Sequence, residues 1–339
     1  MKAALLYEGG DVRVEETADP DPDGWALVSS KAAGVCGTEL HFVEGMIPPP
    51  AYPFQLGHES AGVVLEAPEG SAVAEGDRVA VYNFIGCGSC RSCRTGRESL
   101  CVEPIGQLGF SLPGGFADVI RVPAENLIPL PESVSFETAA ILACSGMSVV
   151  HAARLAGIGL GDTVVVDGIG GVGLMAVQVA VAAGARVLAV ADSTEKGDLA
   201  RELGAAEAII LEGGQGYDGL PDRVKELTKG AGADHYIELV GTEETFLAGI
   251  RSLGRGGKLV IIGYTGEHLN VHPIELILSE IQVITSVAAS RRDLETAIDL
   301  AAAGRLRVTV DTRYPLAEIG EAIERLKARQ VRGRNVVVW

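Results

Sequence analysis

The chain contains 339 residues, of which 47% are hydrophobic and 22% are charged, and its formal net charge is −17. This length predicts two domains, and the composition is typical of a soluble globular protein. The negative charge argues against a nucleic-acid partner, because such proteins present a basic face. The first residues show no basic segment followed by an apolar core, and the longest apolar run, 174–191, is interrupted by polar residues. We therefore expect no signal peptide, no membrane partner and a cytoplasmic location.

The first third of the chain predicts a mainly β domain whose loops carry polar side chains. Alternating apolar residues and turn signals in residues 1–30 indicate short strands. Two later stretches, 32–43 (AAGVCGTELHFV) and 57–64 (GHESAGVV), contain polar side chains between glycines and apolar residues. Taken alone, a histidine in such a loop is more often structural than functional. The candidates in the two stretches are Cys36, Thr38, His41, His58 and Glu59.

Four cysteines follow within fifteen residues, at Cys87, Cys90, Cys93 and Cys101. Thiolates at this spacing on a tight loop can converge on one tetrahedral ion, which favours a structural zinc site. The alternatives are two local disulfides, which are uncommon in a chain without a secretion signal, or four unrelated thiols. Cys144 lies in an apolar helical stretch, 139–151, and by itself is more simply a buried core thiol.

The middle of the chain carries a glycine turn of the kind that binds dinucleotides. A short strand at 163–166 is followed by Gly168, Gly170 and Gly173 and then by an apolar helical run. In this pattern the first glycine permits the tight turn, the second allows a pyrophosphate to approach, and the third packs the helix on the strand. Asp192, which follows the next strand, stands at the distance expected for a ribose-binding carboxylate. The candidate phosphate-binding residues are Gly168, Gly170, Gly171, Val172 and Gly173.

Strand and helix patterns alternate after the glycine turn, which predicts a parallel sheet with helices on its faces. The expected strands are 163–167, 186–191, 207–211, 234–240, 257–263 and 281–287. The expected helices are 172–183, 195–203, 219–229, 243–253 and 291–303.

In combination, Gly57-His58-Glu59 with Cys36 upstream, the four-cysteine loop and the later glycine turn resemble the zinc-dependent medium-chain alcohol dehydrogenase family. The resemblance covers essentially the whole chain. It implies a doubly wound Rossmann cofactor domain inserted into a mainly β, GroES-like catalytic domain. The expected boundaries are 1–145 for the first part of the catalytic domain, with a zinc lobe at about 86–102, 146–287 for the cofactor domain, and 288–339 for the return.

The resemblance also implies roles for individual residues. Cys36 and His58 match two catalytic zinc ligands, and Cys144 falls where the family places the third, a position that is glutamate in some polyol dehydrogenases. Glu59 matches an acid beside the metal, and Thr38 and His41 match a relay that passes the substrate proton to water. The further matches are Cys87, Cys90, Cys93 and Cys101 for a structural zinc, Ser148 beside the nicotinamide, and Arg334 near the pyrophosphate, for which a plain surface charge is an equal alternative.

Two departures from the family pattern bear on the chemistry. Glu39 stands where an aspartate usually orients the histidine ligand, so the surroundings of the metal are expected to differ. At the end of the second cofactor strand, the usual acid position holds Ala191, and Asp192 follows it. A carboxylate near the ribose repels a 2′-phosphate, so we expect NAD rather than NADP.

The leading hypothesis is a zinc-dependent oxidoreductase that transfers a hydride between a small-molecule alcohol and NAD(P), with two zinc ions per chain. One alternative is a zinc-stabilised nucleotide-binding protein without redox turnover. Others are a specialised polyol or hydroxy-amino-acid dehydrogenase, and a metal-free quinone or enoyl reductase of the same fold. The resemblance further implies a homodimer or homotetramer.

Overall fold

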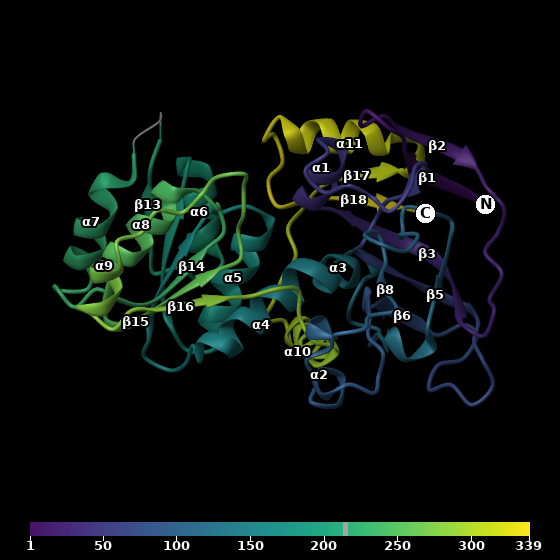
Figure 1. Cartoon of the computed structure of the whole chain (residues 1–339), viewed down its shortest axis with the longest axis horizontal. Helices are drawn as coiled ribbons and strands as arrows, with labels where there is room; N and C mark the ends of the chain where they lie inside the picture. The colour runs from purple at the N-terminus through teal and green to yellow at the C-terminus, as the bar shows by residue number, and fades with distance from the viewer. Residues whose placement is uncertain (213–215) are drawn as a thin grey trace. The chain divides into compact units, whose positions relative to one another are not determined.

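The computed structural model describes residues 1–212 and 216–339, which form two units. Unit 1 contains Met1–Met147 and Ala289–Trp339, and unit 2 contains Ser148–Ala288 (Figure 1). Unit 1 is thus built from both ends of the chain, while unit 2 is one continuous segment. Each unit has its own apolar core.

Unit 1 is a mainly antiparallel β structure. A small sheet has the order β2-β1-β4, and a seven-stranded sheet has the order β10-β6-β5-β3-β18-β17, with β9 also paired to β3. The last strand, β18, therefore lies inside the larger sheet, antiparallel to β3 and parallel to β17. The strands are β1 (Lys2–Leu6), β2 (Val12–Glu16), β3 (Ala26–Val35), β4 (Phe54–Gln55), β5 (Ser60–Glu66), β6 (Arg78–Val81), β7 (Phe84–Ile85), β8 (Gly106–Gln107), β9 (Val119–Val122), β10 (Leu127–Pro129), β17 (Val310–Pro315) and β18 (Arg334–Val338).

Short helices in unit 1 carry several of the candidate residues. A π-helical turn at Leu142–Gly146 joins two helical segments and contains Cys144. Turns of this kind are rare and are frequently found at functional sites, whereas the sequence pattern predicts only a continuous helix here. The helices are α1 (Gly37–Val43), α2 (Arg91–Arg94), α3 (Phe136–Ile141), α10 (Arg291–Ala302) and α11 (Ile319–Lys327), and α4 (Met147–Ala156) leads into unit 2.

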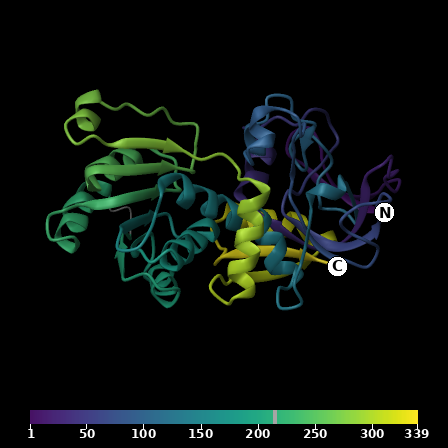
Figure 2. The same cartoon turned by 90° about the horizontal axis from the view of Figure 1, so that it is seen from below.

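Unit 2 is a six-stranded parallel sheet in the order β13-β12-β11-β14-β15-β16, with helices on both faces (Figure 1, Figure 2). The strand order reverses between β11 and β14, which is where doubly wound sheets bind their ligands. The predicted alternation of strands and helices is confirmed. The elements are β11 (Thr163–Asp167), α5 (Gly171–Ala182), β12 (Arg186–Ala191), α6 (Thr194–Glu202), β13 (Glu207–Ile210), α7 (Leu220–Leu227), β14 (Ala233–Glu238), α8 (Glu243–Ser252), β15 (Leu253–Ile261), α9 (Pro273–Ile277) and β16 (Gln282–Thr285).

The continuous helical stretch Phe136–Ala156 has the length and hydropathy that crossing a membrane requires. It contains α3, the π turn and α4. Of its most apolar window, 78% is buried inside the protein, as expected for a core helix. The sequence predicts an apolar helical stretch at 139–151, and the structure extends it at both ends.

Candidate metal and cofactor sites

Four candidate residues of unit 1 meet in one cluster. Ligand atoms of Cys36, His58, Glu59 and Cys144 all lie within 4.8 Å of one another. Cys36 stands between β3 and α1, His58 and Glu59 directly precede β5, and Cys144 comes from the π turn. Because β3 and β5 are neighbours in the sheet, their ends bring the first three residues together. The π turn supplies the fourth.

Glu39 holds two of these residues with one carboxylate. Its Oε1 lies 2.8 Å from Nδ1 of His58, and its Oε2 accepts the backbone N–H of Cys36 at 2.8 Å. Glu39 is the third residue of α1, so the contact with Cys36 also caps that helix. The longer side chain at this position therefore still orients the histidine.

The environment of His58 fits a metal ligand. With Nδ1 engaged by Glu39, Nε2 is buried and has no hydrogen-bond partner among the described residues. A buried ring nitrogen without a partner is costly unless another group, such as a cation, meets it. Asn83 fixes the backbone of His58, because its Nδ2 donates to the His58 carbonyl at 2.8 Å. The ring of Phe110 packs edge-on against the imidazole at 5.3 Å between centroids.

Glu59 and Arg334 form a fully enclosed ion pair at this cluster. Glu59 is 0% and Arg334 5% exposed, and the guanidinium donates to Oε1 of Glu59 while its Nη1 lies 3.8 Å from Sγ of Cys36. A Cβ at position 34 would collide with Oε2 of Glu59, so Gly34 makes room for the carboxylate. Burial raises the pKa of Glu59 to about 7, against the opposing effect of the guanidinium. Arg334 thus lies beside the metal cluster, and its contact with a pyrophosphate stays a prediction.

The two thiols of the cluster, Cys36 and Cys144, interact with each other. Hydrogen bonding between them lowers the pKa of Cys36 well below its usual value and raises that of Cys144. Metal ligation requires a thiolate, and the lowered pKa of Cys36 favours that form. Thr38 lies beside them, with Oγ1 3.8 Å from Sγ of Cys36, and His41 follows three residues later on α1. Residues three apart share a helix face, so the hydroxyl of Thr38 and the imidazole of His41 are neighbours on α1.

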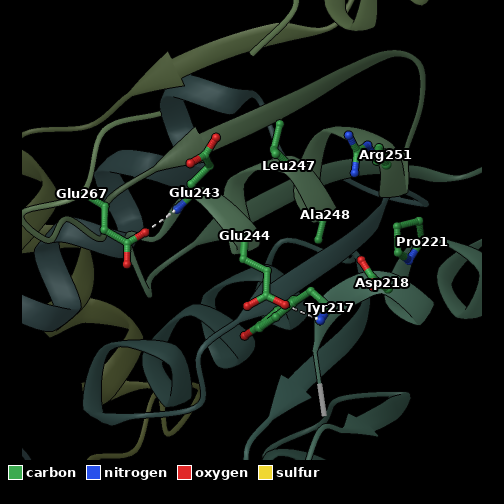
Figure 3. Close-up of a pocket in the computed structure, with 9 residues that line it drawn as sticks. All are labelled: Tyr217, Asp218, Pro221, Glu243, Glu244, Leu247, Ala248, Arg251 and Glu267. Carbon is green, nitrogen blue, oxygen red and sulfur yellow. Dashed lines mark hydrogen bonds between the residues drawn. The ribbon is translucent and has the colours of Figure 1, made fainter. Parts of the chain in front are cut away.

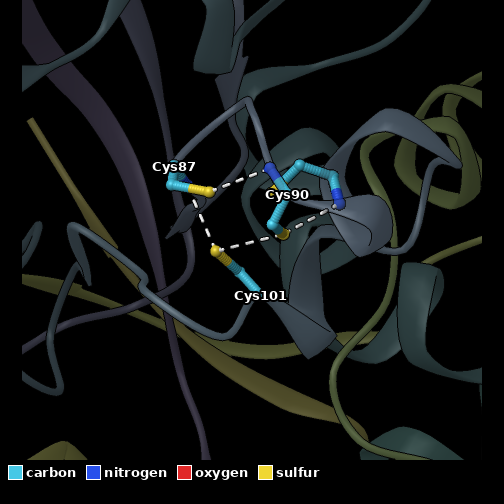
Figure 4. Close-up of side chains that lie close together, drawn as sticks. Cys87, Cys90 and Cys101 are labelled. Carbon is cyan, nitrogen blue, oxygen red and sulfur yellow. Dashed lines mark hydrogen bonds between the residues drawn. The ribbon is translucent and has the colours of Figure 1, made fainter.

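The second cysteine cluster is built as a separate loop. Cys87, Cys90, Cys93 and Cys101 have sulfur atoms within 4.8 Å of one another, and all six cysteines of the chain are free thiols. The disulfide alternative is therefore not what the structure contains. Backbone N–H groups point at the sulfurs: that of Cys87 donates to Cys101 at 3.2 Å and that of Cys90 to Cys87 at 3.3 Å (Figure 4). A hydrogen bond from Ser89 lowers the pKa of Cys87 to about 6. Four cysteine sulfurs placed in this way suit a tetrahedral zinc ion.

The glycine turn has the conformation that its motif predicts. Gly168 has a φ of +100°, and a Cβ at Gly173 would strike the carbonyl oxygen of Gly168, so both positions require glycine. In contrast, a Cβ at Gly170 would meet no protein atom within 4 Å. Room is therefore left in front of the first turn of α5, where Gly171, Val172 and Gly173 present backbone N–H groups.

Asp192 and Ser148 are the other two candidates in unit 2. Asp192 follows β12 directly, is exposed, and pairs with Nζ of Lys196 at 2.8 Å. Ser148 lies in α4, where unit 2 begins.

Comparisons with known proteins agree with this geometry. A family model described as an alcohol dehydrogenase GroES-like domain matches residues 22–132, and one described as a zinc-binding dehydrogenase matches residues 171–303. The chain is 37% identical to an alcohol dehydrogenase of Moraxella sp. (strain TAE123), and the alignment covers 99% of both chains. It is 34% identical to one of Geobacillus stearothermophilus, covering 99% of this chain and 98% of the relative.

The chain belongs to the zinc-dependent medium-chain alcohol dehydrogenase family. It is thus an oxidoreductase of the alcohol dehydrogenase type, with zinc and a nicotinamide dinucleotide as its cofactors. Among solved structures it is similar to the alcohol dehydrogenase of Aeropyrum pernix, with a TM-score of 0.91, 33% identity and 100% coverage of both chains. The expected fold, a Rossmann unit combined with a GroES-like unit, is confirmed.

The chain is also similar to a relative whose name describes a different reaction. The chain is 34% identical to a protein of Metallosphaera sedula named acryloyl-coenzyme A reductase, over 98% of both chains.

Two features of the site could not be predicted from the sequence. The ion pair of Arg334 with Glu59 joins residues far apart in sequence, and the bond of Asn83 to the His58 backbone was not foreseen.

Proposed function

We propose that this dehydrogenase oxidises a small-molecule alcohol, or reduces the matching aldehyde or ketone, with NAD and two zinc ions per chain. The observation that carries the proposal is the convergence of Cys36, His58 and Cys144, with a buried His58 nitrogen that has no hydrogen-bond partner. These three residues would hold the catalytic ion, and Cys87, Cys90, Cys93 and Cys101 the structural one. Three ligands leave a fourth tetrahedral position open.

When bound, zinc polarises the substrate oxygen and the nicotinamide carries the hydride. The side chains of the protein handle the proton. The hydroxyl of Thr38 would accept it from the substrate, and His41, half-buried and one turn further along α1, would pass it to water. Glu39 would keep Nε2 of His58 directed at the ion, because it fixes the opposite ring nitrogen.

Unit 2 would bind the dinucleotide. Backbone N–H groups of Gly171, Val172 and Gly173 would meet the pyrophosphate, and Asp192 would accept a hydrogen bond from the ribose 2′-hydroxyl. In this proposal Ser148 would lie beside the nicotinamide, and Arg334 would contact the pyrophosphate. We propose a homodimer or homotetramer in the cytoplasm.

One experiment tests the proposal directly. Zinc-replete protein is incubated with NAD or NADP and a panel of primary, secondary, polyol and hydroxy-acid substrates, and reduced nicotinamide is followed by its absorbance. Turnover with NAD and one substrate class, together with about two zinc ions per chain, is the expected result. Absence of turnover with every substrate, although both metals and NAD are bound, contradicts the proposal and favours the non-redox alternative.

The similarity to an acryloyl-coenzyme A reductase supports a second candidate, reduction of an activated C=C bond. The same assay in reverse, with NADH or NADPH and short enoyl thioesters, tests it. The Cys36→Ser variant separates the two functions. Alcohol oxidation depends on the catalytic ion and should be lost, whereas a reductase that works without that ion would keep its rate.

A further inference from the structure

A cavity of about 440 Å³ lies in unit 2, between the short helix Tyr217–Gly219 and α8 (Figure 3). The polar groups of Tyr217 in its wall are paired within the protein. The backbone N–H donates to Oε1 of Glu244 at 2.8 Å, and the hydroxyl donates to Oδ1 of Asp167, the buried last residue of β11, at 3.0 Å. These contacts hold the wall of the cavity. A turn in unit 1 bears more directly on the proposed reaction, because it lies against a proposed metal ligand.

This turn, residues 107–112, begins at the end of β8 and is closed by its own hydrogen bonds. The carbonyl of Gln107 accepts the backbone N–H groups of Phe110, Ser111 and Leu112 at 3.1, 2.9 and 3.0 Å. In return, Oγ of Ser111 accepts the N–H of Gln107 at 2.9 Å. The N–H of Gly109 donates to the carbonyl of Leu112, also at 2.9 Å. The backbone of the turn is therefore fixed around Phe110.

The turn packs directly on the backbone at His58. Gly109 has a φ of +75°, and a Cβ at this position would collide with the carbonyl oxygen of Gly57 and crowd the Cβ of His58. The N–H of Leu108 donates to the carbonyl of Asn83 at 2.9 Å, while Nδ2 of Asn83 donates to the carbonyl of His58 at 2.8 Å. The turn and the backbone of His58 therefore share Asn83 as a partner, and only glycine at position 109 permits their close contact.

The ring of Phe110 connects the imidazole of His58 to the core of unit 1. It lies 5.3 Å from the imidazole between centroids, with an angle of 67° between the ring planes. On its other side it lies 5.5 Å from Phe42, at 70°. Both arrangements are edge-to-face contacts of the kind that aromatic rings prefer. Phe42 is 1% exposed and stacks on the buried Phe54, so the half-buried Phe110 rests on a fixed support.

We propose that Phe110 is a positioning residue for His58, an inference that rests on the proposed function: its ring keeps the imidazole in the plane in which Nε2 meets the catalytic ion. Glu39 binds a single ring nitrogen, Nδ1, so the imidazole could still pivot about that hydrogen bond. The side-chain torsion that turns an imidazole is broad. Contact with Phe110 removes this freedom before the ion binds, and a ligand that is already ordered binds more tightly.

The test measures the zinc affinity of the two sites separately. Metal content after dialysis against graded chelator concentrations gives both affinities, and the Cys36→Ser variant, which should keep only the structural ion, shows which step belongs to which site. Phe110→Leu is expected to weaken zinc binding at the catalytic site about fivefold, the effect of one aromatic contact, while the four-cysteine site keeps its parent affinity. Phe110→Tyr retains the ring and should bind zinc as the parent does.

Two controls separate positioning from general stability. Phe54→Leu removes a ring from the same core without a contact to His58, so it should lower the melting temperature and leave the zinc affinity of both sites at parent values. Gly109→Ala, which forces the turn away from His58, should weaken the catalytic site. Its matched control is Gly24→Ala, because Gly24 has a φ of +79° and a Cβ there would meet no atom within 4 Å.

The opposite results would overturn the inference. Parent zinc affinity in a folded Phe110→Leu variant excludes the positioning role. An equal loss of zinc affinity in Phe54→Leu also excludes it, since the effect would then follow the stability of the core. A parent protein that holds no zinc at the cluster of Cys36, His58 and Cys144 refutes the proposed function itself, whereas parent affinity in the variants refutes only the inference.

Discussion

The carboxylate of Glu39 lies 2.8 Å from Nδ1 of His58 and accepts the N–H of Cys36 through its other oxygen. We expect Glu39→Gln to lower the affinity of the catalytic site for zinc about 10- to 100-fold, the range found when a residue that orients a ligand is lost. The structural zinc should remain, because its cysteines are in a separate loop. Metal analysis after dialysis against a graded series of chelator concentrations measures both sites. Loss of the two ions in parallel would contradict this role.

Cys36→Ser removes one ligand of the cluster near His58. We expect alcohol turnover to be abolished and the zinc content to fall from about two to about one per chain, while the protein remains folded. Circular dichroism and metal analysis check the fold and the remaining ion. Oxidation of alcohols at the parent rate would show that the cluster is not catalytic.

Cys93→Ser removes one ligand from the four-cysteine cluster and is the counterpart of the Cys36→Ser variant. Three crowded thiolates would remain without a complete ligand set, so the variant should lose stability or solubility before it loses chemistry. We expect a lower melting temperature at an almost unchanged kcat for the soluble fraction. An unchanged melting temperature and metal content would argue against a structural ion in this loop.

Asp192 is exposed and pairs with Lys196 at 2.8 Å. Asp192→Ala should remove the repulsion of a 2′-phosphate and free the lysine to meet it. We expect the ratio of kcat/KM for NADP to that for NAD to rise about tenfold, which corresponds to about 1.4 kcal/mol. The same ratio in parent and variant would show that residues other than Asp192 determine the preference between NAD and NADP.

Asp167 provides a test by pH. Burial raises its pKa from 3.8 to about 7, and Glu238 on β14 adds to the rise, while the hydroxyls of Tyr236 and Tyr217 oppose it. The folded protein therefore holds this proton more tightly than the unfolded chain, so the stabilisation is full below the unfolded pKa and is lost as the pH rises through 7.

Asp167→Asn removes this titration while it keeps the size of the side chain. Between pH 5 and pH 8 the free energy of unfolding of the variant should rise relative to the parent by about 2 kcal/mol. Urea unfolding at the two values measures the difference. Asp218→Asn, at an exposed carboxylate, is the control and should follow the parent. A constant difference between Asp167→Asn and the parent would refute the assignment.

The sequence allowed the fold to be predicted because its signals are local. Apolar strand runs, the glycine turn and the cysteine spacing each lie within a short stretch, and the resemblance to the family linked them. The contacts that complete the sites are not local: Arg334 meets Glu59, and Tyr217 meets Asp167, only after the chain has folded. The π turn at Leu142–Gly146 was missed for a related reason, since its residues fit an ordinary helix equally well.

The position of β18 inside the larger sheet has a consequence during synthesis. Asn335 of β18 pairs with Val35 of β3. β3 is synthesised early, so this pairing cannot form until β18 leaves the ribosome near the end of translation. Unit 2, one continuous segment, can finish its own sheet while unit 1 still exposes an unpaired edge of β3. Nascent chains that stall after unit 2 should therefore be the form of this protein that depends most on chaperones.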